Sequence, residues 1–276
     1  MGSIIEVKDL HHRYPNGFRA LRGVSVTVAK AEFVAIIGQN GSGKTTFVKH
    51  LNGLLRATAG MIRINGQNIR KRRVSEMART VGYCFQNPDH QIFCDTVYKE
   101  VAFGPRNLHL SQAELDERVD EALGAVGLLH VKDEMPKDLS KGHRQRVAVA
   151  SVLSMRPEIL IIDEPTTGQD YRDGVEMLNL VQRLNEAGHT ILFITHDMPM
   201  VARLLDALSF FGMGKSSWMV RRSKFLRNPP CCGRPFSLLH PSPVWRRHFL
   251  NSSRRQYSPW TRWSSSPWPC CRKAKR

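Results

Sequence analysis

Up to about residue 210, short apolar runs alternate with segments whose apolar positions recur every three or four residues. The strict alternation of VSVTV (24–28) and the run MIRI (61–64), which precedes Asn65-Gly66, predict strands of a small antiparallel sheet. Longer apolar runs predict buried strands of the kind that a parallel sheet contains. These runs are EFVAII (32–37), TVGYCF (80–85), EILIID (158–163) and HTILFITH (189–196).

Helical periodicity predicts the segments between these strands. Apolar residues recur at helical spacing in TTFVKHLNGLL (45–55) and in DGVEMLNLVQRLNEAG (173–188). The stretch from about 95 to 155 is also predicted to be helical, and in it Ser111 and Glu114 form a capping-box pattern. An apolar stripe follows, which consists of Leu115, Val119, Ala122, Leu123 and Val126. A helical block inserted into a strand–helix–strand order predicts an α/β core with a helical arm.

Charge and composition divide the chain near residue 210. Residues 211–276 hold 15 of the 41 Lys and Arg residues, none of the 24 Asp and Glu residues and all five Trp residues. Residues 1–210 have the nearly neutral composition of an ordinary globular domain. Their apolar runs fall far short of the roughly 18–20 residues that span a bilayer. Because the N-terminus also lacks a signal region, we expect a cytosolic or peripheral protein.

The segment GQNGSGKT (38–45) matches the pattern of a phosphate-binding loop between a predicted strand and a predicted helix. Gly41 and Gly43 allow the backbone N–H groups to face a phosphate, Lys44 adds a positive charge, and Thr45 can bind Mg²⁺. A glycine-rich turn ahead of a helix is the alternative. The strand, the helix and the Lys-Thr pair together favour a nucleotide site.

Two carboxylates and a histidine follow the predicted core strands. Asp163 ends the run 158–163 and can hold Mg²⁺ through water, while Glu164 can take a proton from an attacking water or orient it. His196 ends the next strand, at the edge where a parallel sheet gathers its ligands. A solvated Asp-Glu pair and a surface histidine are the alternatives, and the phosphate loop in the same chain favours a functional role.

A second helix start with anion-binding character occurs in LSKGHRQRVAVA (139–150). Ser140 occupies the position of an N-cap, with Lys141 and Gly142 after it. The free N–H groups and the positive dipole end of such a helix suit an anion. The chain therefore combines two phosphate-facing helix starts with a single phosphate-loop pattern.

The order of these motifs resembles that of the ATP-binding-cassette ATPases. The phosphate loop, Gln86 after a strand, LSKGHRQR, ILIIDEP, TTGQD and a strand ending in His196 follow one another, and the resemblance covers residues 4–206. It implies a P-loop NTPase of α/β class, with a RecA-like parallel-sheet core, an N-terminal antiparallel β-subdomain and an inserted helical subdomain. The implied division is core and β-subdomain over 1–92, helical subdomain over 93–156, and the second part of the core over 157–210.

In these ATPases two cassettes pair head to tail, and each ATP lies between the phosphate loop of one and the signature helix of the other. In this chain the signature is LSKGHRQR (139–146), and the signature helix is the helix that it begins. The resemblance therefore implies that Ser140 and Gly142 contact the γ-phosphate of the partner's nucleotide. It also implies that Asp170 couples the two sites and that Tyr14 stacks on adenine. For Tyr14, an aromatic residue at the plain turn Pro15-Asn16-Gly17 is an equally good explanation.

The resemblance further implies the cofactors ATP and Mg²⁺. Its catalytic residues are Glu164, His196, Gln86 and Lys44, where Glu164 activates the water and Gln86 passes a signal to a membrane partner. The implied metal ligands are Thr45, Gln86 and Asp163. The nucleotide contacts implied in and after the loop are Gly38, Gln39, Asn40, Gly41, Ser42, Gly43, Lys44, Thr45 and Thr46.

The signature differs from the usual family pattern at two positions. Lys141 replaces the first of its two glycines, and His143 stands where a glutamine is common. Lys141 can add positive charge toward the phosphate, or its side chain can be merely solvated. The sequence leaves both possibilities open.

The segment FQNPDHQIF (85–93), with LSKG and EPTTGQD, is similar to the ATPase subunits of energy-coupling factor transporters, which import vitamins and cobalt or nickel into bacteria and archaea. This branch implies a second ATPase subunit, a transmembrane coupling protein, and a separate membrane protein that captures the substrate. It also implies a peripheral position on the cytoplasmic face of the membrane and no nucleic-acid partner. The alternatives are an ATPase of another transporter class, and a non-transport cassette that works on DNA or the ribosome.

After Ala207 we expect the family pattern to stop. Family members continue with a hairpin of apolar strands ending near a glycine, whereas the sequence from Leu208 onward is interpreted as lacking it. We hypothesise that the reading frame shifts here, so that the tail 211–276 is an unselected and disordered product. A basic, aromatic arm for nucleic acid or anionic lipid is the alternative. Translation of the underlying nucleotides in the other two frames tests the hypothesis.

Overall fold

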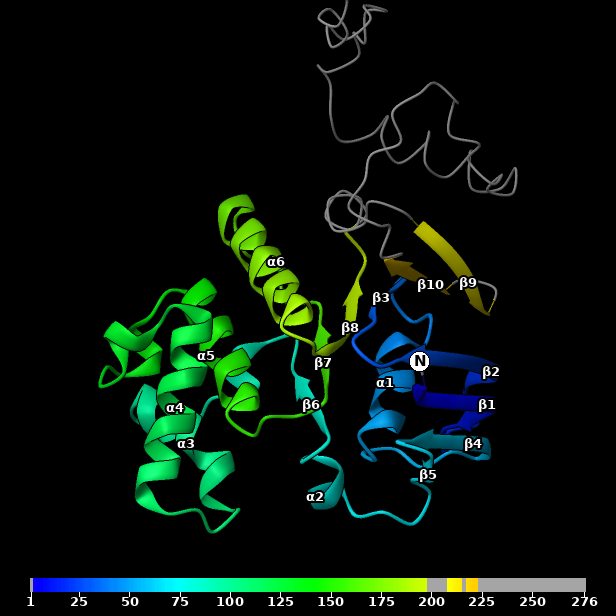
Figure 1. Ribbon diagram of the computed structural model, residues 1–276. Coiled ribbons are helices and arrows are strands. Elements are labelled where there is room, and N and C mark those ends of the chain that lie inside the picture. Colours follow the sequence, from blue (N-terminus) through cyan, green and yellow to red (C-terminus); the bar gives the residue numbers. More distant parts are fainter. Residues whose placement is uncertain (1, 198–207, 215–216, 223–276) are drawn as a thin grey trace, which may run out of the picture. The chain divides into compact units, whose positions relative to one another are not determined.

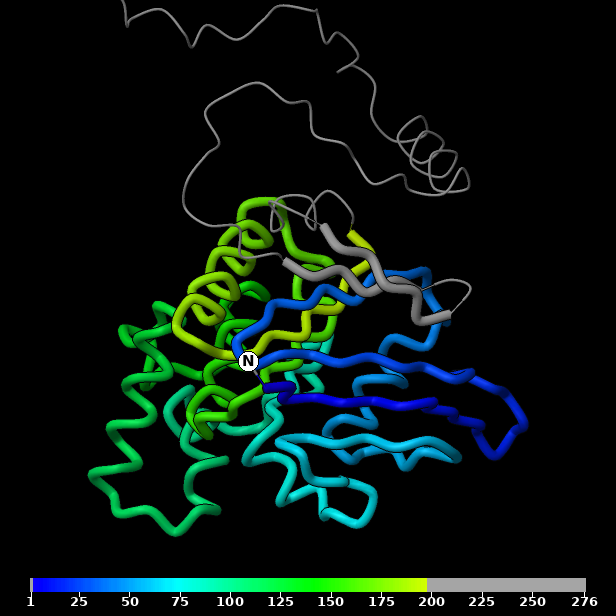
Figure 2. Tube along the Cα trace, turned by 45° about the vertical axis from the view of Figure 1, so that its right-hand side comes forward, coloured from blue at the N-terminus to red at the C-terminus, as the bar shows by residue number. Residues whose placement is uncertain are grey.

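Two β-sheets form the framework of the protein in a computed structural model, which describes residues 2–197, 208–214 and 217–222 (Figure 1). These residues belong to one structural unit, Met1–Phe225. The smaller sheet is antiparallel and has the strand order β2-β1-β4-β5. Its strands are β1 (Ser3–Arg13), β2 (Arg19–Ala29), β4 (Ala59–Ile64) and β5 (Gln67–Asn68). The antiparallel sheet predicted from runs 24–28 and 61–64 is confirmed. Figure 2 shows β1 beside β4, although β2, β3 and α1 lie between them in the sequence.

The larger sheet has six strands in the order β6-β7-β8-β3-β10-β9. The first four are parallel to one another: β6 (Val81–Cys84), β7 (Ile159–Asp163), β8 (Thr190–Thr195) and β3 (Phe33–Gly38). Each corresponds to one of the apolar runs, so these four predicted core strands are confirmed. Because the four strands are parallel, their carboxyl ends meet at one edge of the sheet.

Successive residues of the parallel strands point to opposite faces and bury two separate apolar clusters. On β3, Val34 and Ile36 belong to the cluster that contains Phe47 and Leu51 of α1 and apolar residues of the antiparallel sheet. Phe33, Ala35 and Ile37 of the same strand belong to the cluster formed with α3, α4, α5 and α6. The central sheet is therefore covered on both faces, which explains why its strands are apolar throughout.

The described helices are α1 (Lys44–Leu51), α2 (Val74–Met77), α3 (Val97–Arg106), α4 (Gln112–Val126), α5 (Lys141–Leu153) and α6 (Tyr171–Glu186). Figure 1 shows α3, α4 and α5 as one group on the side of the sheet away from the antiparallel strands. The capping box of Ser111 and Glu114 is confirmed, and every residue of the predicted α4 stripe is buried. Within the described ranges no helix combines the length and the apolar character needed to cross a membrane.

Two predicted helical stretches are shorter than their periodicity indicated. The helix predicted over 45–55 ends at Leu51, because Gly53 adopts a positive φ of 78° that a helix cannot continue through. The block predicted over 95–155 is interrupted after α4 by Gly127, with φ 74°, and by short 3₁₀ turns at Leu129–Val131 and Pro136–Asp138.

The expectation that no hairpin follows Ala207 is corrected by strands β9 (Leu208–Gly214) and β10 (Ser217–Arg222). They pair with each other in antiparallel register, and β10 pairs with β3 from Ser217 opposite Gly38 to Arg221 opposite Val34. Paired in this way, β10 satisfies backbone groups that would otherwise be unpaired along one edge of β3. Residues 223–276, the rest of the predicted tail, lie outside the described residues.

Candidate active site

Glycines shape the loop that joins β3 to α1. Gly41 and Gly43 have positive φ angles of 78° and 94°, a region that other residues adopt with strain. At Gly43 a Cβ atom would also lie 2.8 Å from the backbone oxygen of Ala20, so the loop closes against the start of β2. The first N–H groups of α1 follow directly and lack helical partners, which is the arrangement that binds phosphate.

The side chain of Lys44 is turned back into this loop. Its ammonium donates hydrogen bonds to the backbone oxygens of Gly38, at 2.8 Å, and Gln39, at 3.2 Å. Only 5% of the Lys44 side chain is exposed, so its positive charge is enclosed by the loop and by the residues next to it. These contacts hold the ammonium group inside the loop that joins β3 to α1.

Glu164 is the point at which the predicted catalytic side chains meet. Its carboxylate accepts a hydrogen bond from Gln86 Nε2 at 2.9 Å, and it lies 3.2 Å from His196 Nδ1 and 3.8 Å from Lys44 Nζ. The residue is buried and follows β7 with a φ of 45°, and its backbone N–H donates to the oxygen of Ile194 on β8. The parallel register thus joins residues that follow three adjacent strands and the phosphate loop.

Asp163 lies beside Glu164 in a buried, hydrogen-bonded position. Tyr83 on β6 donates its hydroxyl to Asp163 Oδ2 at 2.7 Å, and Thr45 hydrogen-bonds to the same carboxyl group. Burial raises the pKa of Asp163 above its ordinary value, with a smaller contribution from the charge of Glu164, and the bonds from Tyr83 and Thr45 act in the opposite direction. Burial and the negative charge of Asp163 likewise raise the pKa of the Tyr83 hydroxyl.

The site offers the oxygen atoms that Mg²⁺ prefers. The Thr45 hydroxyl and the Asp163 carboxylate are within hydrogen-bonding contact of each other next to the phosphate loop. Gln86 is joined to the same group of residues through Glu164. Since Mg²⁺ on a nucleotide is bound by one or two protein oxygens together with phosphate oxygens, this donor set fits the metal.

The segment that carries Gln86 is attached to the signature helix. The amide of Gln145 on α5 donates to the backbone oxygen of Phe85 at 3.2 Å, and Phe85 N–H donates to Gln91 Oε1 at 3.1 Å. Gln91 also donates to the oxygen of Ala148 on α5 at 2.7 Å. Sequence reasoning missed Gln145, Gln91 and Tyr83, because their partners lie far away along the chain.

Tyr14 is half-buried above the start of α1. Its hydroxyl lies 3.0 Å from the hydroxyl of Thr46, and its ring meets the ring of His12 edge-on, with centroids 4.6 Å apart. Behind it, His12 Nδ1 lies 3.1 Å from Nε2 of the buried His50. The histidine pair, which no sequence motif indicated, supports the position of Tyr14 next to the phosphate loop.

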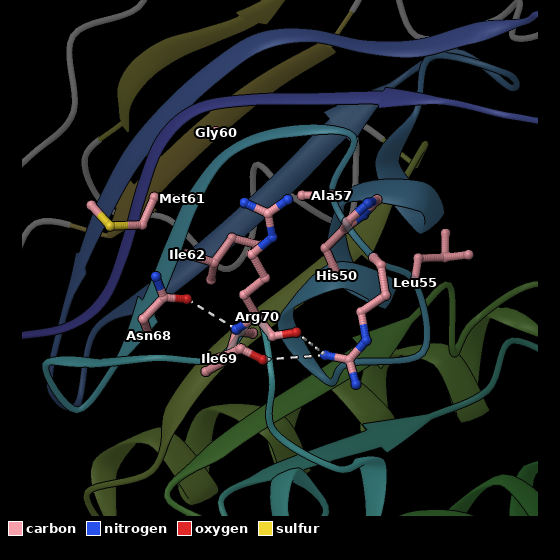
Figure 3. Close-up of a pocket in the computed structure, with 10 residues that line it drawn as sticks. His50, Leu55, Ala57, Gly60, Met61, Ile62, Asn68, Ile69 and Arg70 are labelled. Carbon is pink, nitrogen blue, oxygen red and sulfur yellow. Dashed lines mark hydrogen bonds between the residues drawn. The ribbon is translucent and has the colours of Figure 1, made fainter.

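A pocket opens on the other side of His50, between the end of α1 and strands β4 and β5 (Figure 3). The guanidinium group of Arg56 donates to the backbone oxygens of Ile69, at 3.2 Å, and Arg70, at 3.0 Å. Asn68 accepts a hydrogen bond from the backbone N–H of Arg70. None of the predicted nucleotide or catalytic residues lines this pocket.

Ser140 of the signature and Asp170 of the TTGQD segment lie at the N-terminal ends of two helices, and their hydrogen bonds are caps. Ser140 is exposed and accepts a hydrogen bond from His143 N–H at the start of α5. Asp170 is exposed and accepts one from Asp173 N–H at the start of α6. Gly142 is buried where a Cβ atom would collide with the carboxylate of Asp173. The contacts described here do not join Ser140, Gly142 or Asp170 to Lys44 within the subunit.

Comparison with known proteins identifies the family of this chain. The ABC transporter family matches residues 21–167. The energy-coupling factor transporter ATP-binding protein EcfA of Methanocaldococcus jannaschii is 44% identical over 214 residues, which cover 77% of this chain and 77% of that protein. A relative from Caldanaerobacter subterraneus subsp. tengcongensis, an ABC transporter ATP-binding protein by name, is 50% identical over 212 residues. Those residues cover 77% of this chain but only 37% of that longer protein.

Two solved structures share the fold. CbiO1 from Clostridium perfringens, described as part of the ABC transporter complex cbiONQ, has a TM-score of 0.70 and 37% identity, and the match covers 75% of this chain and 83% of CbiO1. The ATP-binding cassette MJ0796, solved as a dimer in a post-hydrolysis state with ADP and Pi, has a TM-score of 0.64 and 28% identity. That match covers 71% of this chain and 89% of the cassette. The chain belongs to the ABC transporter family of ATP-binding proteins, with the P-loop α/β fold of its ATPase domain.

Proposed function

We propose that this chain is the ATP-hydrolysing subunit of an energy-coupling factor type importer. The observation that carries the proposal is the convergence of Gln86, His196 and Lys44 on the buried carboxylate of Glu164 beside a phosphate loop. A carboxylate held between an amide, an imidazole and an ammonium group is suited to orient water against the γ-phosphate.

In the proposed reaction, water attacks the γ-phosphorus of ATP, and the bond to the bridging oxygen of ADP breaks. Glu164 accepts the proton of the water, while Gln86 and His196 keep its carboxylate oriented. The Lys44 ammonium exchanges its contacts with loop carbonyls for phosphate oxygens. Thr45 and Asp163, with Gln86, would hold Mg²⁺, which when bound neutralises charge on the phosphate oxygens.

The second phosphate-facing helix start has a place in this proposal if two subunits pair head to tail. Ser140 is exposed at the N-terminus of α5, and the contacts of its own subunit leave it on the surface. In a head-to-tail dimer, Ser140 and Gly142 would face the ATP bound by the partner's Lys44, and Asp170 would couple the two sites. The dimeric state of the MJ0796 cassette supports this arrangement.

Membrane partners enter the proposal through the relatives. Two relatives are named as ATP-binding proteins of the energy-coupling factor transporter: EcfA of M. jannaschii and EcfA of Methanoculleus marisnigri. The second of these proteins is 41% identical to this chain over 213 residues. CbiO1 is described as part of a transporter complex. By the same relationship, this chain would sit at the cytoplasmic face of the membrane under a transmembrane coupling protein, while a separate membrane protein captures a vitamin or a metal ion such as cobalt.

Two measurements test the proposal. In the first, ATP hydrolysis is measured, and subunit association is followed in parallel by light scattering. Association should require ATP, and both association and hydrolysis should require Lys44. Expression together with the genomic neighbours, followed by purification from detergent-solubilised membranes, should recover a membrane coupling protein. A chain that hydrolyses ATP at full rate as a dilute monomer would contradict the dimer, and recovery with nucleic acid instead would contradict the transport role.

A further inference from the structure

Lys141, the first residue of α5, is one of the two positions at which the signature departs from the family pattern. Its Cα lies on the exposed end of the helix, but its ammonium group does not simply point into solvent. Lys141 Nζ donates a hydrogen bond to the backbone oxygen of Thr167 at 3.0 Å. A Cβ atom on Gly168 would lie 2.6 Å from the same nitrogen, so the lysine chain packs directly across this glycine.

The loop that Lys141 touches begins with the catalytic carboxylate. Thr167 N–H donates to the backbone oxygen of Glu164 at 3.2 Å, and the Thr167 hydroxyl donates to Glu164 Oε2 at 3.4 Å. The loop then turns at Gly168, with φ 70°, and ends at Asp170, the N-cap of α6. Thr167 therefore forms direct hydrogen bonds both with the signature lysine and with Glu164, the predicted catalytic residue.

The two helices on either side of this contact are packed closely. Gly142 of α5 lies so near Asp173 of α6 that a side chain at residue 142 would collide with its carboxylate. One turn further along, Arg146 forms an ion pair with Glu176 of α6. The contact of Lys141 with Thr167 thus continues an interface between α5 and the start of α6 within one subunit.

We infer that Lys141 is a positioning residue, which holds the loop Glu164–Asp170 of its own subunit against the signature helix and thereby keeps Glu164 aligned. The ammonium group of Lys141 forms a charge-assisted hydrogen bond with a backbone carbonyl. This bond tethers a loop in which φ is positive at Glu164, with 45°, and at Gly168, with 70°. The consequence for the ATP hydrolysis cycle rests on the proposed function. When the signature helix of one subunit closes over the partner's nucleotide, Lys141 would also fix the position of the Glu164 carboxylate in its own subunit.

The first test needs no hydrolysis. Amide hydrogen exchange of the loop 164–170 is compared between the wild type, Lys141→Gln, and the control Lys137→Gln, an exposed lysine shortly before the signature, all without nucleotide. We expect exchange in the loop to be about three- to tenfold faster only in Lys141→Gln, the factor that one hydrogen bond of ordinary net strength controls. Unchanged exchange would overturn the inference.

The second test separates positioning from phosphate binding by steady-state kinetics. A positioning role predicts that Lys141→Gln lowers kcat about three- to tenfold, leaves the KM for ATP within about twofold, and is rescued by Lys141→Arg. A raised KM with an unchanged kcat would instead assign the ammonium group to nucleotide binding and overturn the inference.

The third test assigns the effect to one subunit. The active subunit, either wild type or Lys141→Gln, is mixed with an excess of Glu164→Gln subunits. The Glu164→Gln subunits are expected to bind ATP and to pair with the active subunit without hydrolysing their own ATP. Lys141→Gln in the active subunit should lower its hydrolysis, whereas the same change in the Glu164→Gln partner should not. The reverse result overturns the inference. If the wild type ignores the added partner altogether, the head-to-tail dimer has failed, and the exchange measurement still decides the role of Lys141.

Discussion

Replacement of Glu164 by glutamine perturbs the centre of the site with almost no change of shape. Glutamine keeps the length of the side chain and one oxygen, so the Gln86 amide at 2.9 Å retains an acceptor. What disappears is the negative charge beside Lys44 and His196, and with it the ability to take a proton from water. Loss of a general base costs about 10²–10⁴ in rate, which corresponds to about 3–5 kcal/mol of activation free energy.

The effect of this change on folding should be much smaller. Glu164 is only 8% exposed, so the removal of its charge abolishes an ion pair with Lys44 but also relieves the desolvation of a buried carboxylate. These two terms oppose each other, and we expect a net change below about 1 kcal/mol, or less than about 4 °C in Tm. A slow variant with an unchanged melting temperature would therefore have lost a catalytic group and not its fold.

The assay is single-turnover hydrolysis of ATP, with subunit association measured in parallel. We expect Glu164→Gln to bind ATP, to form a longer-lived dimer and to hydrolyse about 10²–10⁴ times more slowly than the wild type. Glu158→Gln is the matched control, because Glu158 is an exposed glutamate at the opposite end of β7 that contacts Lys30 and Asn65. Hydrolysis within about threefold of the wild type would refute the role of Glu164 as base.

Further predictions concern the loop, the histidine pair and the adenine site. Gly43→Ala should destabilise the protein by about 1–3 kcal/mol in chemical denaturation, because residue 43 has a φ of 94°. Gly124→Ala should instead stabilise it by about 0.5–1 kcal/mol, because Gly124 lies in the interior of α4 and a Cβ there meets no atom within 4 Å. Burial lowers the pKa of His50 below its ordinary 6.5, so the unfolded chain binds the proton more readily than the folded protein. The free energy of unfolding should therefore be at its full value above about pH 6.5 and should fall as the pH drops below it. This part of the pH dependence should disappear in His50→Gln. Tyr14→Ala should weaken ATP binding by about 1–3 kcal/mol, measured by titration calorimetry, while Tyr14→Phe keeps the stacking surface and most of the affinity.

The sequence alone determined the parts of this protein that depend on neighbouring residues. The phosphate loop requires its glycines at particular positive φ angles and its lysine at the first turn of α1, and both requirements are local. The strands β3, β6, β7 and β8 are apolar because each is covered on two faces, and this also shows in a short window. The positions of Asp163 at the end of β7, of Glu164 directly after it and of His196 directly after β8 could be predicted for the same reason.

Only the tertiary structure decided which of these ends meet, because the order of strands in the sheet differs from their order in the chain. Gln86 reaches Glu164 across 78 positions of sequence, and Tyr83 reaches Asp163 across 80. The hairpin β9–β10 was missed because its partner, the edge of β3, belongs to the beginning of the chain. Lys141 looked like an irregularity of a motif until the fold placed Thr167 within reach of its ammonium group. Hydrogen bonds of this kind depend on distance in space, which a local pattern of side chains does not contain.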